Sequence, residues 1–97
     1  MTLQDLIPDV QHIAAANRFE LSVGASKAVL EYSLQDDVII FTHTGVPTEI
    51  EGRGIGSRLV RAGLEFAREE AFRVVPRCWF VAGYIERHPE YRALLSL

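Results

Sequence analysis

The hydrophobic pattern of the chain changes its period once, at a glycine-rich segment near the middle, and this change limits the possible folds. Before the segment, apolar side chains alternate with polar ones, and after it they recur at spacings of three and four residues. Alternation is typical of a half-buried β-strand, whereas the longer spacing is typical of an amphipathic helix. The sequence therefore predicts an α+β fold in which a sheet precedes a helix.

Three segments before the glycines carry the strand pattern. Alternation covers residues 19–24 and 28–33, and β-branched and aromatic side chains fill residues 38–44. Residues 24–27 and 35–37 have the composition of turns. We expect an antiparallel meander whose third strand is central, with both of its faces largely covered.

The residue pattern in the second half of the chain predicts a helix, a short strand and a second helix. The first helix covers residues 56–70, the strand residues 72–76 and the second helix residues 79–87. Pro76 cannot donate a ladder hydrogen bond, so it ends the strand pairing or lies at an edge.

The pattern is weaker at the N-terminus. Residues 2–7 could form a short helix that Pro8 would stop, and residues 10–13 could end that helix or form a strand. Loose ordering of residues 1–9 is one interpretation. The length of 97 residues predicts one domain over residues 1–97.

Composition excludes several functional classes. A net charge of −3 argues against non-specific nucleic-acid binding, which needs a strong positive field. The single cysteine excludes an internal disulfide and a four-cysteine zinc site, and we expect no metal. Neither a signal peptide nor an apolar run of about 20 residues is recognisable, so we expect a cytoplasmic protein without a membrane partner.

The glycine-rich loop spans residues 51–57 and precedes the first predicted helix. Its backbone amides can point into one concavity at the helix N-terminus, which favours a phosphate or pyrophosphate. A P-loop is excluded because no lysine is present, and Ser57 or Leu59 stands where a dinucleotide fingerprint needs its third glycine. A purely structural role in a tight turn is the alternative.

At this loop the sequence resembles the GNAT superfamily of acetyl-CoA-dependent N-acetyltransferases. Their motif, Gln/Arg-x-x-Gly-x-Gly/Ala, corresponds to residues 51–56, where Gly54 and Gly56 match and Glu51 replaces Gln or Arg. Segments 17–19, 43–47 and, most specifically, 75–91 are similar to a small single-domain family that lacks the long N-terminal helices of the superfamily. The resemblance covers about residues 10–95.

The resemblance implies that the strand after the first helix runs parallel to the last strand of the meander and splays away from it. Acetyl-CoA would enter the gap, its pantetheine pairing with the strand before the loop and its pyrophosphate lying on the loop amides. The implied cofactor-binding residues are Thr44, Val46, Glu51, Gly52, Arg53, Gly54, Ile55, Gly56 and Ser57.

Three side chains are candidates for the chemistry that the resemblance implies, in which an amine attacks the thioester directly. Cys78 resembles a cysteine near the acetyl end, where it could contact the acetyl group, act as a nucleophile or donate a proton; a small buried hydrophobe is the alternative. His43 could relay a proton or only bond across the sheet. Tyr84, in competition with Tyr91, could be the general acid or a packing residue.

The expected function is that of an acetyl-CoA-dependent N-acetyltransferase acting on an amine of a protein, peptide or small molecule. The open site that the absent N-terminal helices leave would suit a protein or peptide tail. The alternative is a non-catalytic acyl-CoA-binding module, because no carboxylate stands between Val38 and Val46 to act as a base.

Overall fold

The computed structural model describes residues 9–96, so the predicted helix at residues 2–7 and most of the segment expected to be loosely ordered lie outside it. The elements, in chain order, are β1 (Gln11–Ile13), η2 (Ala14–Ala16), β2 (Arg18–Val23), β3 (Ser26–Gln35), β4 (Val38–Gly45), η3 (Thr48–Ile50), α1 (Ile55–Glu69), β5 (Arg73–Pro76), α2 (Trp79–Arg87) and η4 (Pro89–Leu94). The α+β class and the element types predicted from β2 onward are confirmed.

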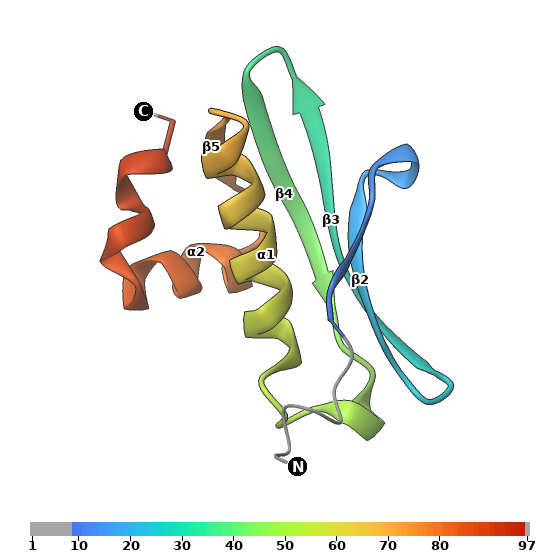
Figure 1. Cartoon of the computed structure of the whole chain (residues 1–97). Coiled ribbons are helices and arrows are strands. Elements are labelled where there is room, and N and C mark those ends of the chain that lie inside the picture. Colours follow the sequence, from blue (N-terminus) through green and yellow to red (C-terminus); the bar gives the residue numbers. More distant parts are fainter. Residues whose placement is uncertain (1–8, 97) are drawn as a thin grey trace.

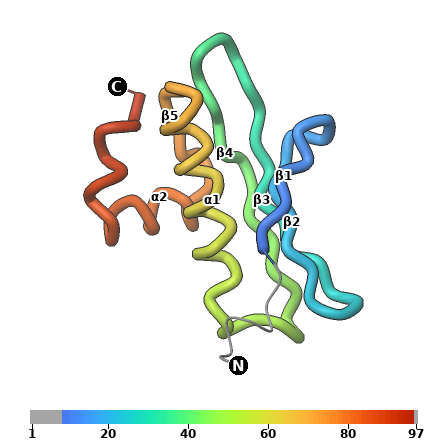
Figure 2. The backbone as a smooth tube through the Cα atoms, in the orientation of Figure 1, coloured from blue at the N-terminus to red at the C-terminus, as the bar shows by residue number. Residues whose placement is uncertain are grey.

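The strands form one sheet in the order β1-β2-β3-β4-β5 (Figure 1). The first four strands pair antiparallel, and β5 pairs parallel to β4, as the resemblance implies. Residues 11–13 form the edge strand β1, which resolves the choice between a helix end and a strand. Figure 2 shows β1 beside β2 on the side of the sheet away from α2.

The turns of the meander are tighter than predicted, and the strands are correspondingly longer. Gly24 and Asp36 have positive φ angles of 59° and 56°, which compact turns require. Glycine adopts this left-handed backbone without steric cost, and aspartate tolerates it. As a result β3 runs from Ser26 to Gln35 instead of covering only residues 28–33.

The core lies on one face of the sheet. Ile39 and Phe41 on β4 are fully buried, whereas Val38 and Ile40 are half-buried and His43 is exposed. Both faces of β4 are thus largely covered as far as Phe41, as expected, whereas Thr42 and His43 near its end are exposed. Helices α1 and α2 lie side by side instead of enclosing the sheet from opposite sides (Figure 1).

We call the opposite side of the sheet the open face. It carries the strand residues that alternate along the sequence with the core residues. Most of these side chains are half-buried or exposed. These residues are Glu20, Val29, Glu31, Ser33 and Ile40. The exception is Glu20, 8% exposed, which forms ion pairs with Arg18 and Lys27.

Helix α1 approaches the sheet closely at Gly63. A Cβ atom there would lie 2.9 Å from Leu30 Cδ2 and 2.9 Å from Phe41 Cε1, closer than real Cβ atoms pack. Both neighbours are fully buried and have little room to move. The absence of a side chain at Gly63 therefore sets the separation of α1 from β3 and β4.

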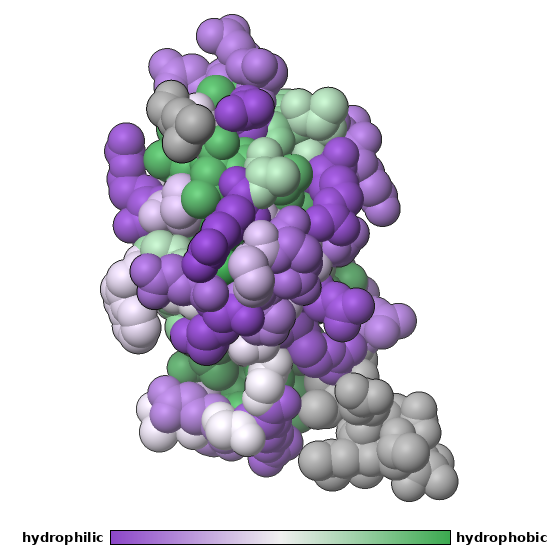
Figure 3. All heavy atoms as spheres, turned by 90° about the vertical axis from the view of Figure 1, so that its left-hand side faces the viewer, coloured by the Kyte–Doolittle hydropathy of each residue, from purple (hydrophilic) through white to green (hydrophobic). Residues whose placement is uncertain are grey.

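The far edge of the sheet is protected at β5. The amide of Ser96 donates to the carbonyl of Val74 at 2.9 Å, and Pro76 ends the strand without an N–H. Pro76 thus ends the pairing and lies at an edge, as predicted. Figure 3 shows apolar side chains gathered in the upper half of this side of the molecule. A hollow of about 540 Å³ lies there between β5, α2 and η4.

No helix within residues 9–96 has both the length and the apolar character needed to cross a membrane.

The close approach at Gly63 predicts the effect of a single methyl group. Gly63→Ala should lower the free energy of unfolding by about 1–3 kcal/mol, because the methyl overpacks a rigid part of the core. Chemical denaturation measures this change. Gly83→Ala in α2 is the matched control, since its Cβ would lie 3.4 Å from the mobile Nη1 of Arg87. That variant should be neutral or stabilised, and an equally large loss in both would contradict the packing argument.

Candidate functional site

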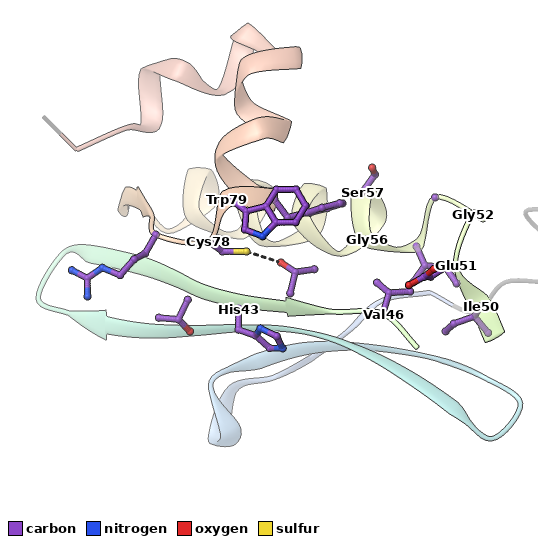
Figure 4. Close-up of a pocket in the computed structure, with 15 residues that line it drawn as sticks. His43, Val46, Ile50, Glu51, Gly52, Gly56, Ser57, Cys78 and Trp79 are labelled. Atoms are coloured by element: carbon purple, nitrogen blue, oxygen red, sulfur yellow. Dashed lines mark hydrogen bonds between the residues drawn. The ribbon is translucent and has the colours of Figure 1, made fainter. Parts of the chain in front are cut away.

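A cavity of about 740 Å³ lies between the end of β4, the glycine-rich loop and the start of α2 (Figure 4). Most of the predicted site residues line it: His43, Thr44, Val46, Glu51, Gly52, Gly54, Ile55, Gly56, Ser57 and Cys78. Arg53 and Tyr84 do not line it. Residues far apart in the sequence thus meet at one hollow.

The cavity opens because two neighbouring strands differ in length. Pairing of β4 with β5 ends at the register pair Phe41 and Pro76, and β4 continues to Gly45. The last link is the amide of Cys78, which donates to the carbonyl of Phe41 at 2.9 Å. Beyond this point β5 has no residue to offer the exposed edge of β4.

A β-bulge at Thr42 decides which side chains face this opening. Tyr32 pairs with Phe41 and Glu31 with His43, so Thr42 is an extra residue in β4. Residues directly opposite on paired strands share a face, so His43 lies with Glu31 on the open face. Thr44, opposite the buried Leu30, lies on the helix side. Without the bulge, these two faces would be exchanged.

The bulge brings Thr44 to Cys78, which is half-buried at the start of α2. The Thr44 hydroxyl lies 3.5 Å from Cys78 Sγ at hydrogen-bonding distance (Figure 4). Partial burial raises the pKa of the thiol, but hydrogen bonds from the Thr44 hydroxyl and from nearby backbone amides outweigh it. The pKa of Cys78 is therefore lowered from its ordinary value. A thiol of this kind ionises more readily than an ordinary cysteine.

The glycine-rich loop turns the chain into α1 with two left-handed residues. Gly52 has φ 81° and Gly54, the N-cap of α1, has φ 73°, and no side chain caps the helix. The first amides of α1 therefore have no capping side chain and lie at the cavity. Their partial positive charge makes this end of the cavity suitable for an anion.

Gly56 has a different role from the other two glycines. Its Cβ would lie 2.8 Å from the Cζ atom of Phe80, so the small residue lets α2 pack against the start of α1. Both residues line the cavity where the two helices meet. The absence of a side chain at Gly56 serves packing.

Neither candidate tyrosine reaches the cavity. Tyr84 is buried, its ring is stacked on His88 with centroids 3.9 Å apart, and burial raises its pKa. The Tyr91 hydroxyl donates to Glu65 Oε2 at 2.6 Å, and burial together with this bond raises its pKa to about 12. Both are packing residues here, the alternative left open by the sequence.

Five lining residues were not assigned to the site from the sequence. They are Thr42, Ile50, Arg77, Trp79 and Phe80. Trp79 is 82% exposed at the cavity although it is a large apolar residue. Its position next to Cys78 at a predicted helix start was the available signal.

Comparison with known proteins identifies the family. The model of the GCN5-related N-acetyl-transferase family matches residues 18–94, which run from β2 to the end of η4. The chain belongs to this family. The mouse (Mus musculus) Protein NATD1 is 31% identical over 83 residues, which cover 82% of this chain and 76% of that protein. The zebrafish (Danio rerio) protein is 30% identical over 87 residues, covering 84% and 79%.

A solved structure shares the fold of this GCN5-related chain. The solution structure of a GCN5-like protein from Staphylococcus aureus aligns with a TM-score of 0.71 and 25% identity, covering 91% of this chain and 87% of that one. The expected GNAT-like architecture is thereby confirmed, and membership of the family indicates an acyltransferase.

The bond between Thr44 and Cys78 generates a prediction about the thiol. Thr44→Val removes a hydrogen bond that stabilises the thiolate, so the pKa of Cys78 should rise. The pH dependence of thiolate absorbance, or of alkylation by iodoacetamide, measures this pKa. Thr42→Val is the control, because that hydroxyl bonds to the carbonyl of Glu31 instead. Equal pKa values in Thr44→Val and the unchanged protein would contradict the assignment.

Proposed function

We propose that the protein is an N-acetyltransferase that binds acetyl-CoA in the cavity and transfers the acetyl group directly to an amine. The observation that carries the proposal is the cavity itself, where an unpaired strand edge, an uncapped helix N-terminus and a cysteine of lowered pKa meet. Family membership supports acyl transfer. The identity of the acyl donor and the class of acceptor are our inference.

The two ends of acetyl-CoA match two parts of the cavity. The pyrophosphate suits the amides at the start of α1, because their partial positive charge favours an anion. The pantetheine arm contains amide groups, and the edge of β4 beyond Phe41 offers backbone donors and acceptors in extended geometry. The arm can therefore add to the sheet where β5 stops, and the thioester lies toward Cys78 and Thr44.

In the proposed reaction the amine nitrogen bonds to the thioester carbonyl carbon and the bond from that carbon to sulfur breaks. His43 takes the proton from the amine, and a backbone N–H near Val46 stabilises the carbonyl oxygen as it becomes negative. The CoA thiolate leaves and takes up a proton. The exposed surroundings of His43 leave the acceptor side accessible to a protein or peptide tail.

The competing function is binding of acyl-CoA without transfer. It is favoured by the sequence of β4, in which no residue from Val38 to Gly45 carries a carboxylate that could act as a base. Acetyl-CoA binding with no transfer to any amine in a panel of peptides, polyamines and amino acids would establish that alternative.

The anion site predicts opposite effects of two charge changes on acetyl-CoA binding. Gly54→Glu places a carboxylate at the N-terminus of α1 and should abolish measurable binding in calorimetry. Glu51→Gln removes a carboxylate that lines the same part of the cavity and should tighten binding by about two- to fivefold.

Gly54→Ala is the control for the first of these changes, because any side chain is strained at a φ of 73°. It should lose about 1–2 kcal/mol of stability yet retain binding. If the protein folds but does not bind acetyl-CoA, both the transferase and the binding-module functions are wrong.

The role of Cys78 separates direct transfer from a covalent route. Under direct attack, Cys78→Ser should retain a measurable rate of transfer, and mass spectrometry of the unchanged protein with acetyl-CoA should detect no acetyl group on Cys78. A covalent route instead requires an acetylated Cys78 that forms and decays at the rate of turnover.

A further inference from the structure

His43 differs from the two other histidines of the chain in its surroundings. His12 Nε2 lies 2.6 Å from the Tyr32 hydroxyl, and His88 Nδ1 lies 2.9 Å from the carbonyl of Tyr84. Within residues 9–96 the ring of His43 makes no comparable hydrogen bond and no ion pair, although it lines the cavity. Within the same residues, the close approach of the ring to Gly45 is the contact that bears on its orientation.

Gly45 leaves room for the ring of His43 by having no side chain. Gly45 lies two residues after His43 on β4, pairs with Val29, and so faces the open side of the sheet. A Cβ atom at Gly45 would lie 3.1 Å from His43 Nε2 and 3.7 Å from Val29 Cγ2. The imidazole thus occupies the space on the open face that a side chain at position 45 would fill. Figure 4 shows the ring below β4, leaning along the strand toward Val46.

Even one methyl group at position 45 would disturb this arrangement. A separation of 3.1 Å is tighter than ordinary van der Waals contact, so the ring of His43 would have to move by a few tenths of an ångström. The backbone at Gly45 has no positive φ angle, so alanine is not excluded there by backbone strain. The consequence of the substitution should therefore fall mainly on His43.

We propose that Gly45 is a positioning residue for His43. By leaving space on the open face of the strand, it lets the imidazole lie along β4 at the cavity, where in the proposed function it takes the proton of the amine. This inference rests on the proposed function, since it assigns a purpose to the orientation of the proposed base. It also provides a physical reason for a glycine within a strand, where glycine otherwise costs about 0.5–1 kcal/mol.

Two simpler roles for Gly45 compete with this one. The glycine could allow a ligand to approach the backbone closely, or it could ease the end of the strand. In both cases a methyl group would harm the protein whether or not His43 is present. The positioning role instead requires that the penalty disappear when the imidazole is removed.

The experiment compares four proteins: the unchanged chain, Gly45→Ala, His43→Ala and the double variant. Acetyl transfer is measured at saturating acetyl-CoA with the best amine from the panel, and acetyl-CoA affinity is measured by calorimetry. His43→Ala should lower kcat by about 10²–10⁴-fold, the usual contribution of a general base. Gly45→Ala should lower kcat by about three- to tenfold through misplacement of the base, with little change in affinity.

The double variant decides between the roles. The positioning role predicts that Gly45→Ala changes kcat less than about twofold when His43 is already alanine, because interacting residues are not additive. An equal loss in both backgrounds, or a loss of affinity in place of kcat, would assign Gly45 to ligand approach or strand geometry and overturn the proposal.

A second measurement does not depend on activity. In the ligand-free protein, nuclear Overhauser effects between the His43 ring protons and the Gly45 Hα protons should be observed. If these effects are absent although the protein transfers acetyl groups, the proposed placement of the His43 ring by Gly45 is wrong and the proposed function is unaffected. Their presence in a protein that binds acetyl-CoA but acetylates no amine contradicts the proposed function, and with it the catalytic use of the imidazole.

Discussion

The early end of β5 is the constraint on which the site depends. Pairing with β4 stops at Phe41 and Pro76, and the amide of Cys78 makes the last bond before the chain turns into α2. The edge of β4 beyond Phe41 therefore has backbone donors and acceptors that β5 does not pair, beside a cavity where a ligand with amide groups can bind them. Gly56, where a Cβ atom would lie 2.8 Å from Phe80 Cζ, lets α2 pack against the start of α1 beside this opening.

The bulge at Thr42 divides the chemistry between two sides of one strand. Thr44 joins Cys78 on the helix side, while His43 reaches the open face two residues before Gly45. A strictly alternating strand would have buried the imidazole and exposed the threonine. One additional residue thus supplies the thiol with its hydrogen-bond donor and leaves the imidazole accessible from outside.

Much of the fold could be predicted from local pattern, because alternation and helical spacing reflect burial directly. β2, α1 and α2 lie within about two residues of their predicted limits. The exposure of Thr42 and His43 was not predicted, because a run of β-branched and aromatic side chains does not show where the cover of the sheet ends. The loop and Cys78 could be assigned to the site because motif residues carry the resemblance. The bulge, the Phe80 contact of Gly56 and the burial of Tyr84 outside the cavity lining depend on tertiary packing, which no local pattern encodes.

Trp79 gives the protein a built-in optical reporter. It is the only tryptophan in the chain, and its indole is 82% exposed at the cavity. Intrinsic fluorescence therefore reports mainly on the mouth of the site, where a ligand that approaches the indole changes its emission. The same indole is already in water in the folded state, so global unfolding changes its surroundings little. Fluorescence is thus well suited to following ligand entry and poorly suited to measuring the stability of this protein.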